Sequence, residues 1–197
     1  MIKFQKINNI VKFKQMKNLF YLILIFAVFF ISPTMSAQTI TGNTIICSSE
    51  SFTASTWGAN YQWVASPNLS LSNQWANPVT VSAAGSGAAK LSYLDNNQTV
   101  IKTIDIWVGV PVITSIDGPT STPNYQYASY SAVIPYAANP TSYQWILNPQ
   151  LSNNLYGASS SRLDIAFYDA GYYQLVVRAE NSCGWGPYYV LNSLYVY

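Results

Sequence analysis

The sequence has no histidine, few charged residues and only two cysteines. Charged residues make up 8% of the 197 residues. Histidine is the commonest general base near neutral pH, so its absence removes that base. It also excludes Ser–His and Cys–His nucleophiles and histidine-based zinc sites. A phosphate-binding loop is excluded too, because Gly85-Ser86-Gly87 lacks the lysine that such a loop needs. We therefore expect no enzyme activity, no metal site and no cofactor.

Long apolar runs are also scarce, and the one that exists lies near the N-terminus. Residues 19–31 form an unbroken apolar run of 13 residues, shorter than the roughly 20 residues of a membrane-spanning helix. Lysines precede the run and Ser36-Ala37 offers small residues for cleavage, a pattern typical of a secretory signal peptide. We interpret residues 1–37 as a signal peptide, with a membrane anchor as the alternative. Because Met16 opens a leader of ordinary length, we hypothesise that residues 1–15 are a start-site artefact.

Removal of this leader changes the charge balance of the chain. Five of the nine basic residues lie within residues 1–37, so the remaining four face seven acidic residues and give a net charge of −3. A mildly acidic chain with four dispersed cations has no basic patch for nucleic acid. We expect a protein that is secreted or exposed at the cell surface, without a membrane span after signal removal and without nucleic acid as a partner.

The rest of the chain contains an internal repeat. Tyr61-Gln62-Trp63 recurs 82 residues later as Tyr143-Gln144-Trp145, and residues 87–97 are similar to residues 171–181. Each copy consists of short alternating segments bounded by Gly, Pro, Asn and Ser, with no sustained helical period.

This pattern predicts an all-β fold of two tandem antiparallel β-sandwiches, at 38–109 and 110–197. The short junction Gly109-Val110-Pro111 predicts an end-to-end row with limited hinge freedom. The expected strands lie near 44–47, 51–56, 60–65, 79–83, 88–95 and 99–108 in the first copy, and near 112–117, 127–136, 142–147, 162–167, 171–180 and 187–196 in the second.

Aromatic residues mark the expected core. Trp63 and Trp145 lie in the middle of alternating segments, so we expect each indole to face the core of its copy. Asp169-Ala170-Gly171 precedes Tyr173, and this D-x-G-x-Y pattern resembles the tyrosine corner of immunoglobulin-type sandwiches. We therefore give Asp169, Gly171 and Tyr173 structural roles.

Together, the repeated Tyr-x-Trp, the Asp-Ala-Gly-x-Tyr turn and the Glu-Asn-Ser-Cys-Gly segment resemble the PKD-type and immunoglobulin-like repeats of secreted Bacteroidota proteins. The resemblance covers nearly all of residues 38–197. It implies extracellular β-sandwich modules that serve as spacers, adhesion units or recognition units and have no catalytic activity. The acidic Trp-Asp-x-Gly-Asp-Gly type of motif found in typical PKD domains is absent.

The resemblance also bears on the two cysteines. Similar modules pair a cysteine near the start of the module with one in the Asn-x-Cys-Gly segment. Cys47 has the first position in the first copy, where Thr99 takes the second; Cys183 has the second position in the second copy, where Pro123 takes the first. A disulfide needs Cα atoms within about 7 Å. We expect an end-to-end row to keep Cys47 and Cys183 apart and unpaired, with a bridge between the copies as the alternative.

Tyrosine is abundant, with 16 residues, more than the small cores can hold. Exposed rings with a polar tip suit the recognition of sugars or protein surfaces. The candidate ligand-binding residues are Trp185, Tyr188, Tyr172 and Trp75. The alternative is that tyrosine occupies these positions only because it suits a half-buried pleated surface.

Our first functional hypothesis is a non-enzymatic spacer, adhesion or protein-interaction module whose partner is an unknown extracellular protein. The second is a carbohydrate-binding module that uses exposed Tyr and Trp faces. The third is a remnant of a larger enzyme whose catalytic domain lies elsewhere. Catalysis by this chain itself is a separate question. A glycosidase needs two carboxyl groups within roughly 10 Å of each other, and Asp164 and Asp169 are close in sequence. For these two residues we favour an outward strand position and a turn role, respectively, over catalysis.

Overall fold

The structure is a computed structural model that describes residues 38–150 and 153–197. Within these ranges the chain consists of β-strands and one short 3-10 helix, η1 (Tyr136–Ala138), which confirms the prediction of an all-β fold. The predicted signal peptide, residues 1–37, lies outside the described residues. No helix in the described ranges is long and apolar enough to cross a membrane.

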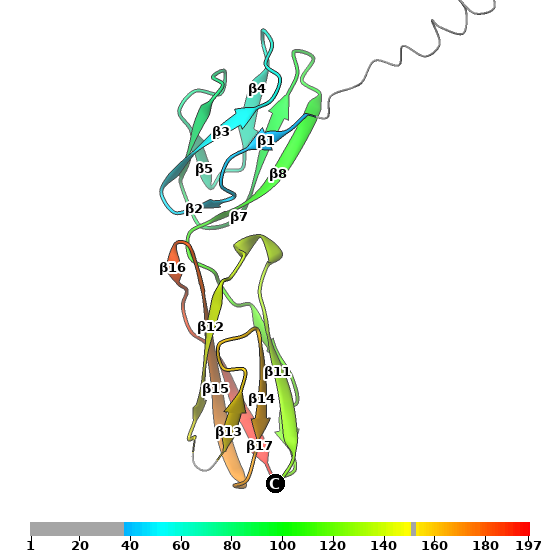
Figure 1. The fold of residues 1–197 in the computed structure, drawn as a ribbon, viewed down its shortest axis with the longest axis vertical. Helices are drawn as coiled ribbons and strands as arrows, with labels where there is room; N and C mark the ends of the chain where they lie inside the picture. The colour runs from blue at the N-terminus through cyan, green and yellow to red at the C-terminus, as the bar shows by residue number, and fades with distance from the viewer. Residues whose placement is uncertain (1–37, 151–152) are drawn as a thin grey trace, which may run out of the picture. The chain divides into compact units, whose positions relative to one another are not determined.

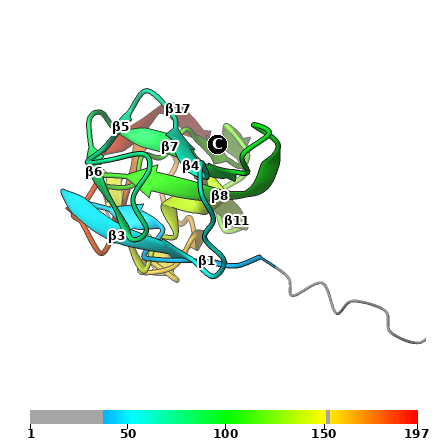
Figure 2. The same ribbon diagram turned by 90° about the horizontal axis from the view of Figure 1, so that it is seen from above.

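Residues 38–109 form two sheets (Figure 1). One sheet has the order β1 (Ile40–Thr41), β3 (Ser49–Ala54), β6 (Val79–Ala83), β5 (Leu69–Leu71). The other has the order β2 (Ile45–Ile46), β8 (Val100–Val108), β7 (Gly87–Leu94), β4 (Gln62–Ala65). Neighbouring strands are antiparallel except for β2 and β8, which run parallel. Strands β3 and β8, seen from above in Figure 2, thus belong to different sheets.

Residues 110–197 repeat this arrangement. One sheet has the order β13 (Asn154–Tyr156), β14 (Arg162–Ala166), β11 (Tyr127–Val133), β9 (Ser115–Asp117). The other has the order β10 (Ser121–Thr122), β17 (Tyr189–Val196), β15 (Gly171–Asn181), β12 (Ser142–Asn148), and β16 (Gly184–Trp185) adds to β15. Here β10 and β17 form the parallel pair.

Both halves therefore use the strand order of an immunoglobulin-like sandwich. In residues 38–109, the sheet of β1, β3, β6 and β5 corresponds to the ABED sheet of that fold, and β4, β7 and β8 correspond to its CFG sheet. In residues 110–197, β9, β11, β14 and β13 correspond to ABED, and β12, β15 and β17 to CFG. The short strands β2 and β10 each switch to the second sheet beside its last strand. The internal repeat of the sequence is thus a repeat of topology.

Each half has its own hydrophobic cluster, centred on a tryptophan. Trp63 is fully buried and packs against Tyr93, with ring centroids 5.0 Å apart. Trp145 is 4% exposed in the second cluster. Each indole N–H donates a hydrogen bond to a main-chain carbonyl, Trp63 to Ala76 at 2.9 Å and Trp145 to Ser160 at 2.8 Å. The buried polar end of each ring is therefore satisfied.

Tyr173 has the geometry of a tyrosine corner. Its buried hydroxyl donates to the carbonyl of Asp169 at 2.8 Å, and Gly171 has a φ of +152°, which suits glycine. The first half has Ala89 at the equivalent position. In the first half, a different tyrosine makes a comparable hydrogen bond: the hydroxyl of buried Tyr93 donates to the carbonyl of Thr56 at 2.6 Å.

Sheets and hydrophobic clusters separate near residue 109, because no sheet or cluster of the described residues includes strands from both halves. By contacts, however, Gln38–Tyr197 forms a single compact unit. The division into domains at 38–109 and 110–197 therefore stays a prediction.

Candidate functional site

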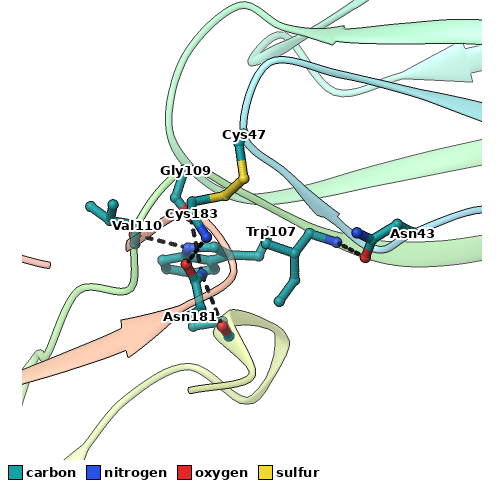
Figure 3. Close-up of a disulfide and its surroundings, with 9 residues drawn as sticks. Asn43, Cys47, Trp107, Gly109, Val110, Asn181 and Cys183 are labelled. Carbon is teal, nitrogen blue, oxygen red and sulfur yellow. Dashed lines mark hydrogen bonds between the residues drawn. A yellow bond between two sulfur atoms is a disulfide. The ribbon is translucent and has the colours of Figure 1, made fainter. Parts of the chain in front are cut away.

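The two cysteines form a disulfide, so the prediction that Cys47 and Cys183 are unpaired is wrong. Their Cα atoms lie 5.3 Å apart, and the bridge joins residues 136 positions apart in sequence (Figure 3). Cys47 directly follows β2, whose Ile46 pairs with Val108 at the end of β8. Cys183 lies in the turn that connects β15 to β16. Both cysteines are therefore at the linker.

The prediction failed because it compared the positions of the cysteines in the aligned sequences of the two copies. It did not consider at which end of its sandwich each cysteine lies. Thr99, the expected partner position of Cys47, immediately precedes β8, whereas Cys47 lies beside the other end of that strand. Similarly, Pro123 follows β10 at the end of β17, away from Cys183. Neither position could supply a partner within the same half, and a bridge across the linker needs no folding back.

Hydrogen bonds reinforce this junction. Asn181, 4% exposed, donates through Nδ2 to the carbonyls of Gly109 at 3.1 Å and Ala138 at 3.2 Å. Its Oδ1 accepts from the N–H of Cys183 at 2.8 Å. Trp107 donates through Nε1 to the carbonyl of Val110 at 3.0 Å (Figure 3). The linker is therefore held by side chains from both halves.

The outward side of β12, β15 and β17 carries a stacked group of aromatic and cationic side chains. The Arg178 guanidinium lies 4.7 Å from the Trp185 ring centroid and 4.6 Å from that of Tyr188. Arg178 Nε also donates to Gln144 Oε1 at 2.7 Å. This arrangement fixes the guanidinium between two rings, where cation–π attraction adds to the hydrogen bond.

The same side continues along the strands. Ile146, Val176 and Val190 are cross-strand neighbours in one row, and Ile146 and Val190 are each 40% exposed. Beyond them, Tyr172 packs against Tyr195 with ring centroids 4.8 Å apart. We call this surface the outer aromatic face; its members are Gln144, Ile146, Tyr172, Val176, Arg178, Trp185, Tyr188, Val190 and Tyr195.

The structure brings three of the four candidate ligand-binding residues to this face. Trp185, Tyr188 and Tyr172 are 37%, 48% and 74% exposed, but Tyr172 lies at the opposite end from the other two. Trp75 is 46% exposed in the loop between β5 and β6 of the first half, and does not join them. A ligand-binding role for all four stays a prediction.

Sequence reasoning missed a second surface, on the other sheet of the second half. Tyr127, Ser129, Tyr156, Arg162 and Asp164 line a cleft of about 440 Å³, which we call the tyrosine cleft. Alternation alone placed Asp164 outward, but the three-residue strand β13, which supplies Tyr156, was not predicted. Without the pairing of β13 with β14, no sequence signal joins these residues.

The acidic residues form no obvious chemical centre. In residues 38–150 and 153–197, no three His, Cys, Asp or Glu side chains gather in a way that could hold a metal ion. Asp164 accepts hydrogen bonds from Ser129 and Arg162 on the outward side of β14, whereas Asp169 belongs to the tyrosine corner.

Comparisons with known proteins identify no relative by sequence: no family model matches the chain, and neither does any curated protein. Among solved structures, the chicken CNTN1 FN1–FN3 domains are 13% identical, with a TM-score of 0.41, covering 80% of this chain and 65% of theirs. Domains 4 and 5 of the surface-layer protein SbsC are 11% identical, with a TM-score of 0.33, covering 82% and 98%.

The chain spans only 22% and 28% of two longer SbsC structures that it matches. A putative membrane-anchored protein from Corynebacterium diphtheriae is 13% identical, with a TM-score of 0.33, covering 81% of this chain and 53% of that one. We draw nothing about function from likenesses at this level. By its own strand order, the described part of the chain has the immunoglobulin-like β-sandwich fold.

Proposed function

We propose that the chain is a non-enzymatic, secreted or cell-surface module that presents the outer aromatic face to a protein partner. The observation that carries this proposal is the stack of Arg178 between Trp185 and Tyr188. Trp, Tyr and Arg are the residue types that dominate the binding energy of protein interfaces. Because the guanidinium is already held by Gln144, less side-chain freedom is lost when a partner binds.

The junction supports a spacer role for the same module. The Cys47–Cys183 disulfide and the Asn181 hydrogen bonds fix the linker from both sides, so the face is held in a defined position relative to the first half. Disulfides persist in oxidising compartments, which supports a location outside the cytosol.

A pull-down with residues 38–197 tests the proposal. Wild-type protein is immobilised and incubated with outer-membrane and host-surface extracts, alongside Trp185→Ala and Tyr188→Ala. A Tyr136→Ala variant is the matched control, because Tyr136 is 99% exposed on η1, outside the outer aromatic face. We expect a discrete protein to be captured by wild type and control, and capture to fall at least about 10-fold in the other two variants. Equal capture by all four proteins would contradict the proposal.

We also propose that the chain belongs with the PKD-type repeat proteins of secreted Bacteroidota and that its leader is cut after Ala37. The repeated Tyr-x-Trp and the Asp-Ala-Gly-x-Tyr turn support the first statement, and the short apolar run at 19–31 supports the second. N-terminal sequencing of the exported protein should begin at Gln38. A start elsewhere would refute the cleavage site.

The second candidate function is that of a carbohydrate-binding module. The tyrosine cleft favours it, because two tyrosines there flank the polar side chains of Ser129, Arg162 and Asp164.

A further inference from the structure

The tyrosine cleft is built by the register of three strands. Ser129 of β11 and Tyr156 of β13 both lie opposite Asp164 of β14, so the three side chains form a row across the sheet. Tyr127 lies opposite Ala166. Tyr127 is 68% exposed whereas Ala166, on the same side, is 4% exposed, which shows that neighbouring side chains stand over this alanine.

The floor of the cleft is polar and its charges balance. Arg162 donates through Nε to Asp164 Oδ1 at 3.1 Å and through Nη2 to Ser129 Oγ at 2.9 Å. The Ser129 hydroxyl donates to the same carboxylate oxygen. These hydrogen bonds from Ser129 and Arg162 lower the pKa of Asp164, so the carboxylate stays ionised at neutral pH. One cation beside one anion gives the cleft no net charge.

Two tyrosines flank this floor. The rings of Tyr127 and Tyr156 have centroids 6.1 Å apart and planes inclined by 43°, and Tyr156 is 49% exposed. A second pair, Tyr125 and Tyr168, has centroids 6.3 Å apart. Asn154, two residues from Tyr156 on the same strand, donates to the Tyr168 hydroxyl at 3.4 Å. The aromatic surface therefore extends beyond the cleft itself.

We propose that the tyrosine cleft binds a neutral glycan. A pyranose ring has C–H groups that pack against aromatic rings and hydroxyls that both donate and accept hydrogen bonds. Tyr127 and Tyr156 contact the C–H face, while Asp164 accepts from sugar hydroxyls and Arg162 donates to them. A volume of about 440 Å³ lies within the range of small-molecule sites.

The charge distribution selects a neutral ligand over an acidic one. The Arg162 guanidinium is already engaged by Asp164 and Ser129, and an acidic sugar would also bring its carboxylate towards that of Asp164. The proposal is independent of the protein-binding function, because the cleft and the outer aromatic face lie on the outward sides of two different sheets.

Binding is tested with the disulfide-bonded chain of residues 38–197 on an array of neutral and acidic oligosaccharides. The neutral glycan with the strongest signal is then titrated calorimetrically into wild type, Tyr156→Ala, Tyr156→Phe and Asp164→Asn. Tyr136→Ala serves as the control, because this tyrosine is 99% exposed on η1, outside the tyrosine cleft and the outer aromatic face. Thermal unfolding of each variant verifies that it is folded.

We expect neutral glycans to be retained in preference to acidic ones. Tyr156→Ala and Asp164→Asn should each weaken binding at least about 10-fold, as expected for loss of a stacking ring or of a charged hydrogen-bond acceptor. Tyr156→Phe, which keeps the ring, and Tyr136→Ala should bind within about 2-fold of wild type. Absence of neutral-glycan binding, a preference for acidic glycans, or equal loss in Tyr136→Ala would overturn the proposal. None of these results affects capture of a protein through Trp185.

Discussion

Replacing Cys47 and Cys183 by serine should destabilise the two halves unequally. With both halves unfolded, the bridge closes a loop of 136 residues, and the loss of chain entropy in that loop corresponds to about 5 kcal/mol. With one half still folded, the closed loop runs only from one cysteine to the linker, roughly 60–75 residues, and the corresponding value is about 4.4 kcal/mol.

This difference makes the effect depend on the order of unfolding. When the first half unfolds, the bridge already closes a loop of roughly 60–75 residues, so removing the disulfide should lower the stability of the first transition by about 4.4 kcal/mol. The second transition, which only lengthens that loop, should lose about 0.6 kcal/mol. A protein that unfolds in a single cooperative step should lose the full value of about 5 kcal/mol.

Urea unfolding of residues 38–197, followed by tryptophan fluorescence and circular dichroism, measures these changes. Because urea slopes for small proteins are about 1–3 kcal/mol/M, the midpoint of the first transition should fall by more than about 1 M in Cys47→Ser/Cys183→Ser. Reductant should produce the same change in wild type and none in the double variant. A total loss below about 1 kcal/mol would refute the loop-entropy reasoning. Two free thiols in denatured, unreduced wild type would refute the disulfide itself.

Three further substitutions test the cores and the tyrosine cleft. Trp145→Ala should destabilise the protein by about 3–5 kcal/mol in urea unfolding, because it empties the centre of a buried cluster; a loss under about 1 kcal/mol would contradict that central role. Tyr173→Phe should lose about 0.5–1.5 kcal/mol with its corner hydrogen bond, whereas Tyr172→Phe, on an exposed ring, should change little. The pKa of Asp164 is lowered in the folded state, so its ionised carboxylate stabilises the fold above the unfolded-state pKa of about 3.9. This stabilisation is lost as the pH falls through the pKa of the folded state. The melting temperature of wild type should therefore fall more steeply below pH 4 than that of Asp164→Asn, and parallel curves would exclude this contribution.

The long strands could be predicted from sequence because each shows alternation over several residues. Residues 79–83 and 162–167 were expected as strands, and the structure has β6 at Val79–Ala83 and β14 at Arg162–Ala166. Strands β1, β10 and β16 have two residues each, too few for a period of two to be visible. Their positions depend on pairing with distant strands.

The sites were harder to predict because they depend on register. A strand pattern shows that Tyr127 and Asp164 point outward, but it does not show that Tyr156 lies opposite Asp164. The disulfide was missed for a related reason. Sequence spacing gives no direction to β2, and only its parallel alignment with β8 places Cys47 at the linker.

The disulfide also determines how the protein would carry a mechanical load. Tension applied between residues 38 and 197 passes from Cys47 to Cys183 through the sulfur atoms and bypasses the intervening chain. With the bridge intact, stretching can release only the short tails on either side, about 25 residues or roughly 90 Å, whereas the reduced chain can extend to more than roughly 500 Å. The chain between the two cysteines is therefore shielded from force, whereas β1, β2 and β17 lie in the tails and are not, and reduction would turn a short tether into a long one.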